Sequence, residues 1–173
     1  RPANVYGASK LAGERIVECL LQRYYIVRAG WMIGGGVGDK KFVGKMVKFI
    51  VGGQTELSAV DDKTGSPTYA RDLMVGIKSL LDSDRYGLFH MVNEGFGTRY
   101  DVAISIANSL GREDLTIKAV SSDEFPLLAP RARSEVMRNQ QLELMGMPSM
   151  RPWQDALHEY LTEELMPALV AAG

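Results

Sequence analysis

The order of apolar patterns along the chain predicts an α/β fold in which strands alternate with helices. Apolar residues recur at helical spacing in several segments, and short runs of β-branched and aromatic residues lie between those segments. Strands joined through helices pair in parallel, because the helix returns the chain to the same end of the sheet. The 173 residues are 46% apolar, which is enough for a sizeable core and predicts one domain by default.

Charge and cysteine content exclude several classes of protein. There are 20 Lys and Arg against 21 Asp and Glu, so the formal charge of −1 gives no sign of a nucleic-acid partner or an acidic membrane surface. The single Cys19 excludes an internal disulfide framework and predicts a reducing, cytoplasmic compartment. No apolar run approaches membrane-spanning length. The chain opens with Arg1-Pro2-Ala3-Asn4 instead of Met, which predicts a fragment of a longer protein.

The first part of the chain predicts a helix, a buried strand and a second helix. Apolar residues share one face of residues 8–23, and an aromatic, β-branched strand follows over residues 25–33. The glycine run 34–38 ends that strand. Asp39 then predicts an N-cap for a helix over 40–51 whose inward residues include Phe49.

The remaining elements continue the alternation. Thr98 and Asp101 resemble a capping box, and Gly111 stands where a helix C-terminus is expected. The predicted elements are a strand at 56–60, a helix at 70–81, a strand at 87–92, a helix ending at Gly111, a strand at 115–120, and helices at 138–146 and 153–165.

Tyr6 and Lys10 are the first candidates for chemistry. Their spacing places both side chains on one helix face, where the ammonium makes the phenol easier to ionise. A Tyr in that setting can act as a general acid or base. Gly7 and Gly13 lie in the same helix, where glycine costs about 0.5–1 kcal/mol relative to Ala and therefore usually has a reason. A solvated helix face explains an isolated Tyr–Lys pair equally well.

Two other groups allow alternative interpretations. The glycine run 34–38 lies between a strand and a helix, as a phosphate loop does, but it lacks the spacing of a dinucleotide fingerprint, which favours a flexible loop beside a substrate pocket. Lys41, Lys45 and Lys48 form a stripe that is a solvated face by default and a diphosphate contact in the sharper interpretation. No histidine has a second ligand at metal spacing, so no metal site is predicted.

The stretch Val5–Glu14, which reads VYGASKLAGE, resembles the catalytic-helix signature of extended short-chain dehydrogenase/reductases. Further stretches follow in the order found in dTDP-4-dehydrorhamnose reductases, so the resemblance covers almost the whole chain. They are Val27–Met32, Phe42–Met46, Gly65–Tyr69 followed by Asp72–Leu73, and Gly87–His90.

The resemblance implies NADP or NAD as cofactor and assigns roles around it. Tyr6 would protonate the substrate oxygen as hydride arrives from the nicotinamide. Lys10 would hold the nicotinamide ribose and favour the Tyr6 phenolate. The backbone around Ala29 and Gly30 would line the nicotinamide pocket.

The resemblance also implies a nucleotide-sugar substrate and a homodimer. Trp31 would border the sugar, and Arg131 and Arg133 would bind the nucleotide part, for which a guanidinium fork suits phosphate oxygens. Lys41 stands where these reductases usually have Asn, and would contact the diphosphate in its place.

The implied architecture is the C-terminal part of a doubly wound, Rossmann-like parallel sheet plus a small α/β substrate-binding lobe. Residues 1–33 would end the NAD(P)-binding domain, and residues 34–173 would mainly form the lobe, with 70–92 as the part that can return to the sheet. The glycine-rich phosphate loop and catalytic Ser or Thr that such enzymes carry upstream do not occur here, so the chain alone is expected to be inactive.

Two alternatives share this fold. One is a nucleotide-sugar epimerase, dehydratase or decarboxylase with bound NAD, because these relatives have the same Tyr–Lys spacing. The other is a non-catalytic regulatory subunit.

Overall fold

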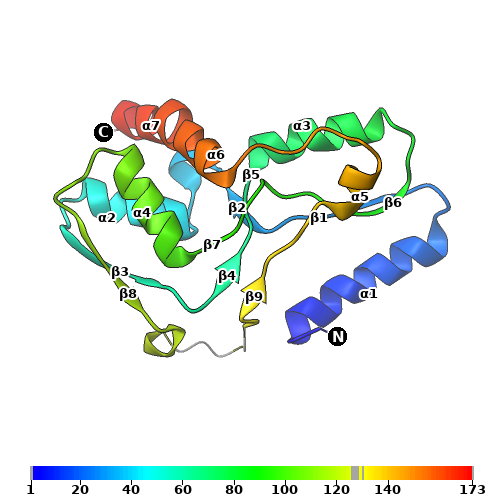
Figure 1. Ribbon diagram of the computed structural model, residues 1–173, viewed down its shortest axis with the longest axis horizontal. Helices are drawn as coiled ribbons and strands as arrows, with labels where there is room; N and C mark the ends of the chain where they lie inside the picture. Colours follow the sequence, from blue (N-terminus) through cyan, green and yellow to red (C-terminus); the bar gives the residue numbers. More distant parts are fainter. Residues whose placement is uncertain (1, 126–128, 130, 173) are drawn as a thin grey trace.

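The computed structural model describes residues 2–125, 129 and 131–172, and it confirms the α/β class (Figure 1). The helices are α1 (Val5–Leu20), α2 (Phe42–Val51), α3 (Ala70–Leu81), α4 (Arg99–Ser109), α5 (Gln140–Leu144), α6 (Trp153–Glu159) and α7 (Met166–Ala172), with short turns η1 (Gly36–Gly38), η2 (Ser122–Glu124) and the π-helical η3 (Tyr160–Leu165). The strands are β1 (Tyr25–Arg28), β2 (Trp31–Ile33), β3 (Glu56–Val60), β4 (Thr64–Gly65), β5 (Pro67–Tyr69), β6 (Gly87–His90), β7 (Gly97–Thr98), β8 (Thr116–Val120) and β9 (Ser134–Glu135).

The strands form small sheets, and parallel pairing dominates. Strand β1 pairs with β6, β2 with β5, and β3 with β8, all in parallel. The short strand β4 lies between β7, which is antiparallel to it, and β9, which is parallel. In Figure 1 the pair β1–β6 runs between α3 on one side and α1 on the other, while α2 and α4 accompany β3 and β8 at the opposite end of the molecule.

The prediction of one strand over residues 25–33 is wrong, because the segment is divided into β1 and β2. The chain changes partners at Ala29-Gly30, from β6 to the segment that holds Ser66. The Trp31 amide donates to the Ser66 carbonyl at 2.9 Å, and a Cβ at residue 30 would lie 2.1 Å from that oxygen. Gly30 is therefore required by the close approach of two backbones, a long-range contact with no local signature.

Two helix starts differ from the predictions for reasons of capping. Helix α1 begins at Val5 because the Asn4 side chain accepts a hydrogen bond from the Gly7 amide at 2.8 Å. Helix α2 begins at Phe42, so Asp39 is not its N-cap residue. The Asp39 carboxylate still accepts from the amides of Lys41 at 2.8 Å and Gly44 at 3.1 Å, and so satisfies the first turn from outside the helix.

The predicted capping box of α4 is confirmed. The Thr98 hydroxyl accepts from the Asp101 amide at 3.0 Å, and the Asp101 carboxylate accepts from the Thr98 amide at 2.7 Å. Gly111 has a φ of +64° just beyond the helix, which is the left-handed conformation that glycine adopts without steric cost.

The main core lies between α2, α4, α6 and η3. Its central side chains are completely buried: Val47, Ala103, Ile106, Ala156, Leu157, Tyr160 and Leu161. Phe49 was predicted to face this core and does not, since it is 45% exposed while Val43 and Val47 are buried. A second cluster around Leu80, Phe89, Met91 and Leu142 fills the space between α3, α5 and β6.

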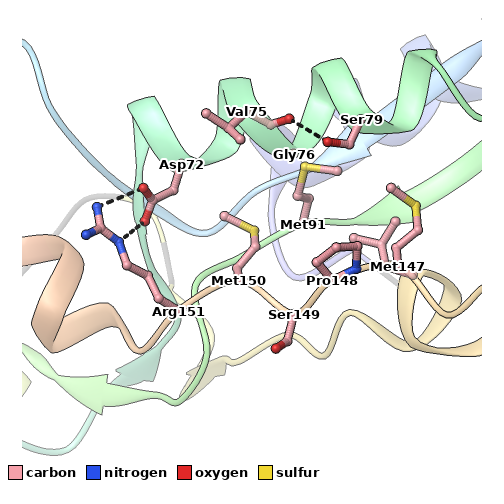
Figure 2. A pocket seen from close by; sticks show the side chains of 11 residues that line it. Asp72, Val75, Gly76, Ser79, Met91, Met147, Pro148, Ser149, Met150 and Arg151 are labelled. Atoms are coloured by element: carbon pink, nitrogen blue, oxygen red, sulfur yellow. Dashed lines mark hydrogen bonds and ion pairs between the residues drawn. The ribbon is translucent and has the colours of Figure 1, made fainter.

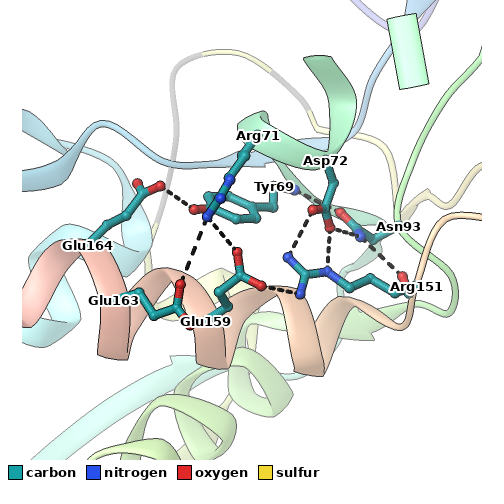
Figure 3. Close-up of polar contacts among 8 residues, drawn as sticks. All are labelled: Tyr69, Arg71, Asp72, Asn93, Arg151, Glu159, Glu163 and Glu164. Atoms are coloured by element: carbon teal, nitrogen blue, oxygen red, sulfur yellow. Dashed lines mark hydrogen bonds and ion pairs between the residues drawn. The ribbon is translucent and has the colours of Figure 1, made fainter. Parts of the chain in front are cut away.

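Polar contacts fix the C-terminal helices to the start of α3 (Figure 3). Arg151 donates two hydrogen bonds to the Asp72 carboxylate, both at 2.8 Å, and pairs with Glu159. Glu159 also accepts from Arg71 at 2.9 Å. The bond from Arg151 lowers the pKa of Glu159, so the carboxylate stays charged. Among the described helices, none is long and apolar enough to cross a membrane.

Candidate functional site

Tyr6 and Lys10 lie together on the first turns of α1. The Lys10 ammonium is 5.5 Å from the centre of the Tyr6 ring, and Tyr6 is 71% exposed. Neither the Tyr6 hydroxyl nor the Lys10 ammonium has a hydrogen-bond partner among the residues that the structure describes. The pair therefore presents a phenol and an amine that are both free to meet a ligand.

An ion pair connects this helix to β1. Arg28 donates to both oxygens of Glu14, at 2.7 and 2.5 Å, and the His90 ring nitrogen lies 3.5 Å from the Arg28 guanidinium. The hydrogen bonds from Arg28 lower the pKa of Glu14, and those to Glu14 raise the pKa of Arg28. Glu14 follows Lys10 by one helical turn, so this contact positions the helix face that carries the Tyr6–Lys10 pair. The sequence gives no local signal for this contact, because Glu14 and Arg28 lie on different elements.

Strand β1 leads directly to Ala29 and Gly30, the residues expected to line a nicotinamide pocket. Both are half-buried at the joint between β1 and β2. The Met91 amide donates to the Arg28 carbonyl at 2.9 Å just before the joint. The structure thus places Ala29 and Gly30 directly after the strand to which α1 is tied, one and two residues beyond Arg28, the partner of Glu14.

Trp31 is held in place from three elements. Its indole nitrogen donates to the Glu135 carboxylate of β9 at 2.6 Å, and the Arg99 guanidinium lies 3.7 Å over its ring. Its ring also packs on Gly65 of β4, where a Cβ would lie 2.2 Å from the indole. Any side chain at residue 65 would displace the ring, which explains the glycine in the Gly-Ser-Pro-Thr run.

Arg99 is a site residue that the sequence analysis did not identify. It is half-buried at the start of α4, and its guanidinium lies 5.1 Å from the Phe42 ring in addition to its stacking on Trp31. Burial lowers the pKa of Arg99 to about 10, and the positive charge of Arg131 acts in the same direction while Glu135 opposes both. Arg99 remains charged at neutral pH. In the sequence, Arg99 is distinguished only by its position directly after Thr98, the N-cap of α4.

The other predicted substrate residues lie around Arg99. Lys41 is exposed and directly precedes Phe42, while Arg131 and Arg133 are exposed on the segment that leads into β9. The Thr64 amide donates to the Arg133 carbonyl at 3.0 Å, which fixes that segment beside β4. The structure brings Trp31, Arg99 and the segment 131–135 together, and Lys41 adjoins them through Phe42.

The glycine run 34–38 does not have the arrangement of a phosphate loop. Gly34, Gly35 and Gly36 all have positive φ angles, and the run leads toward α2. The Asp39 carboxylate already accepts the first-turn amides of α2, so a negative group of the protein occupies the place where a phosphate would sit. The Tyr160 hydroxyl lies 3.5 Å from the same carboxylate.

A cavity of about 220 Å³ opens elsewhere, between α3 and residues 142–151 (Figure 2). Its lining is mainly apolar and includes Gly76, Met91, Met147, Pro148 and Met150, with Asp72 and Arg151 at one end. None of the predicted site residues lines this cavity. No group of three His, Cys, Asp or Glu side chains within the described ranges could hold a metal ion.

Comparison with known proteins shows which family the chain belongs to. Residues 1–166 match the family described as RmlD substrate binding domain. The chain belongs to this family. The dTDP-4-dehydrorhamnose reductase of Mycobacterium tuberculosis is 36% identical over 157 residues, covering 90% of this chain and 51% of the relative. The spore coat polysaccharide biosynthesis protein SpsK of Bacillus subtilis is 34% identical over 162 residues, with coverages of 94% and 55%.

Solved structures of the RmlD family have the same fold. A dTDP-4-dehydrorhamnose reductase from Bacillus anthracis, crystallised in complex with NADP, superposes with a TM-score of 0.87 at 34% identity over 94% of this chain and 57% of that one. A dTDP-glucose 4,6-dehydratase from the same organism reaches 0.68 at 16% identity, which shows the common fold alone. This RmlD-family chain spans about half the length of the curated relatives it matches.

Proposed function

We propose that this chain supplies the catalytic helix and the substrate-binding lobe of an NADP- or NAD-dependent reductase of a 4-keto nucleotide sugar. The observation that carries the proposal is the agreement with relatives named dTDP-4-dehydrorhamnose reductase, which are 33–36% identical over about 90% of the chain. In this proposal residues 1–33 belong to the cofactor domain, and residues 34–173 form mainly the substrate lobe, with 70–92 returning to the sheet.

The described residues fit the nicotinamide end of the cofactor. Lys10 is exposed and has no carboxylate partner in the part of the chain that the structure describes, and the exposed Tyr6 lies beside it. These are the groups needed to hold ribose hydroxyls and to exchange a proton. When bound, the nicotinamide supplies hydride. Tyr6 donates its hydroxyl proton to the carbonyl oxygen of the sugar, and the Lys10 charge stabilises the phenolate that remains.

In this proposal the substrate binds to the residues that lie around β9. Trp31 borders the sugar, while Arg131 and Arg133 bind the nucleotide part and Lys41 contacts the diphosphate. The support is their convergence: Trp31 bonds to Glu135 at 2.6 Å, and the arginines lie on the segment that leads to that residue. In the view of Figure 1 the N-terminal end of α1 lies on the same side of the molecule as β9.

The test is loss of NADPH absorbance with dTDP-4-dehydrorhamnose as substrate. The full-length protein is expected to turn over, and the 173-residue chain alone is expected to be inactive. Turnover by the chain alone would contradict the need for further cofactor-binding residues. Failure of the full-length protein to reduce the substrate, together with a tightly held NAD that is not released, would instead favour an epimerase or dehydratase.

A homodimer through α1 is part of the proposal. Val5, Ile16 and Leu20 are 85%, 59% and 75% exposed on this helix, and apolar surface of this kind drives association. Light scattering of the full-length protein is expected to give the mass of a dimer. A monomer at micromolar concentration would contradict this.

A further inference from the structure

Arg99 is a partly buried cation between aromatic rings. Its guanidinium lies 3.7 Å over Trp31 and 5.1 Å from the Phe42 ring, so much of its surface faces apolar groups instead of water. Within the described part of the chain no oxygen accepts a hydrogen bond from it. A guanidinium taken out of water loses its hydration, and no oxygen among the described residues replaces that hydration at Arg99.

Arg151 shows how the same protein treats a comparable arginine. Arg151 is also only partly exposed, and it donates to Asp72 and Glu159 in a closed network. Arg99 has no such network among the described residues. Because Arg151 finds two carboxylates in the same chain, the lack of described acceptors at Arg99 is a local feature.

The charges around Arg99 leave the corner positive. Glu135 is the carboxylate whose charge acts on Arg99, and one of its oxygens accepts the Trp31 indole proton at 2.6 Å. Arg131 acts on Arg99 with the same sign as Arg99 itself. The charges acting on Arg99 thus include a second guanidinium and one carboxylate, so this corner has a net positive charge that attracts an anion.

Stacking on Trp31 also orients the Arg99 guanidinium so that it can bind two oxygens of one phosphate group. A guanidinium with its face on an aromatic ring keeps the N–H groups at its edge available, and the ring limits its rotation. Paired N–H donors match two oxygens of a phosphate group. Because the side chain is already fixed, less conformational entropy is lost when the ligand binds.

We propose that Arg99, held by Trp31 and Phe42, binds the diphosphate group of the nucleotide-sugar substrate, with Arg131 as a second cationic contact. The proposal rests on the proposed function for the identity of the substrate. The anion site itself rests on the geometry of Arg99, Trp31 and Glu135. Arg99 is assigned to binding and specificity, since nothing places it at the atoms that react.

Calorimetric titration of the 173-residue chain and of the full-length protein tests this with three probes: dTDP, thymidine and inorganic diphosphate. We expect dTDP to bind at least about tenfold more tightly than thymidine. Arg99→Gln is expected to weaken dTDP and diphosphate about 10–100-fold, because it removes charge-assisted hydrogen bonds, and to leave thymidine unchanged. Arg85→Gln is the control, since it removes one exposed positive charge from the loop between α3 and β6 and is expected to change binding less than about twofold.

Two further measurements remain decisive if Arg99→Gln fails to fold. Arg99→Lys keeps the charge but loses the planar fork, and is expected to weaken diphosphate binding about 3–10-fold. In the unaltered 173-residue chain, diphosphate is expected to change the fluorescence of Trp31. Trp31→Phe is expected to abolish that change, because Trp153, the second tryptophan of this chain, is buried in the core.

The outcomes separate the two proposals. Unchanged dTDP binding in the Arg99 variants, equal affinity for thymidine and dTDP, or no binding of dTDP and diphosphate by the full-length protein would each overturn the role of Arg99. If dTDP binding is unchanged in the Arg99 variants but the full-length protein reduces the sugar, the proposed function is still supported. Diphosphate binding that depends on Arg99, in a full-length protein that reduces no nucleotide sugar, would support the anion site and contradict the proposed function.

Discussion

Helices α1 and α4 both begin with a side-chain N-cap, but they differ in how far their residues are buried. Each has a side-chain cap on its first turn, from Asn4 in α1 and from Thr98 in α4. Helix α1 buries none of its residues, whereas α4 buries Val102, Ala103, Ile106 and Ala107. Local sequence therefore determines where each helix starts, but the surrounding chain determines whether the helix contributes to the core.

The difference also separates chemistry from stability. Helix α1 carries the Tyr6–Lys10 pair and is connected to β1 by the Glu14–Arg28 ion pair. Helix α4 lies in the core, and its first residue, Arg99, stacks on Trp31 of the candidate site. The exposed apolar residues of α1 fit a chain that spans about half the length of its relatives. We expect substitutions in the two helices to affect different measurements.

The largest effect is expected from Tyr6→Phe in the full-length protein. Loss of the proton donor should lower kcat by about 10²–10⁴-fold, the usual contribution of general acid–base catalysis. The free energy of unfolding should not change, since Tyr6 is 71% exposed. Steady-state kinetics and urea unfolding measure the two quantities. Tyr86→Phe, in an exposed loop, is the control, and equal rates for both variants would contradict a catalytic role for Tyr6.

A substitution in the buried face of α4 is expected to change the free energy of unfolding and not the catalytic rate. Ile106→Ala should lower the free energy of unfolding by about 2–5 kcal/mol, because Ile106 is completely buried and its truncation leaves a cavity. Leu20→Ala in α1 should cost less than about 0.5 kcal/mol in the 173-residue chain, since Leu20 is 75% exposed. Urea denaturation compares them. Similar losses would mean that α1 is packed in solution in a way the structure does not show.

A smaller loss is expected from Arg151→Gln, which leaves Asp72 and Glu159 without their shared cation. The cost should be about 1–3 kcal/mol, reduced by the partial exposure of these groups to water. Arg138→Gln is the matched control, because its pair with Glu143 is largely exposed and should contribute less than about 0.5 kcal/mol. Thermal unfolding of both variants provides the measurement, and equal shifts would show that the network in Figure 3 adds nothing beyond a surface ion pair.

The smallest effect is expected when the pH is lowered, which should reduce the free energy of unfolding. Hydrogen bonds from Arg28 and Arg151 lower the pKa values of Glu14 and Glu159 below the ordinary value of 4.5. Each carboxylate therefore stabilises the folded chain above about pH 4.5, and that contribution is lost as pH falls through the folded-state pKa. Unfolding measured between pH 3 and pH 7 should show this decline. The decline should be smaller in a Glu14→Gln, Glu159→Gln variant, and an identical profile would contradict the assignment.

Residues whose role depends on near neighbours were predicted correctly. The Thr98–Asp101 capping box, the strand Glu56–Val60 and the helix Ala70–Leu81 all depend on short-range patterns, and the structure has them where the sequence placed them. The inward face of α2 was misjudged at Phe49, because periodicity alone does not fix the rotation of a short helix against its neighbours.

Features that depend on distant contacts could not be predicted. Arg99 became a candidate only when its stacking on Trp31 was known, and these residues are far apart in the chain. The break between β1 and β2 depends on Ser66 in the same way. The Tyr6–Lys10 pair, in contrast, was visible as a spacing, although its role remains a prediction.

The two residues Ala29 and Gly30 form a link between β1 and β2 whose length neither evolution nor design can readily change. Strand β1 is fixed in register with β6, and β2 is fixed in register with β5, so the two residues between them bridge a constant span. Inserting one residue there would turn every following side chain of one strand to the opposite face. Trp31 would then leave Glu135, while α1 would stay bound to Arg28. The joint thus acts as a spacer of fixed length between the helix that carries Tyr6 and the corner that carries Arg99.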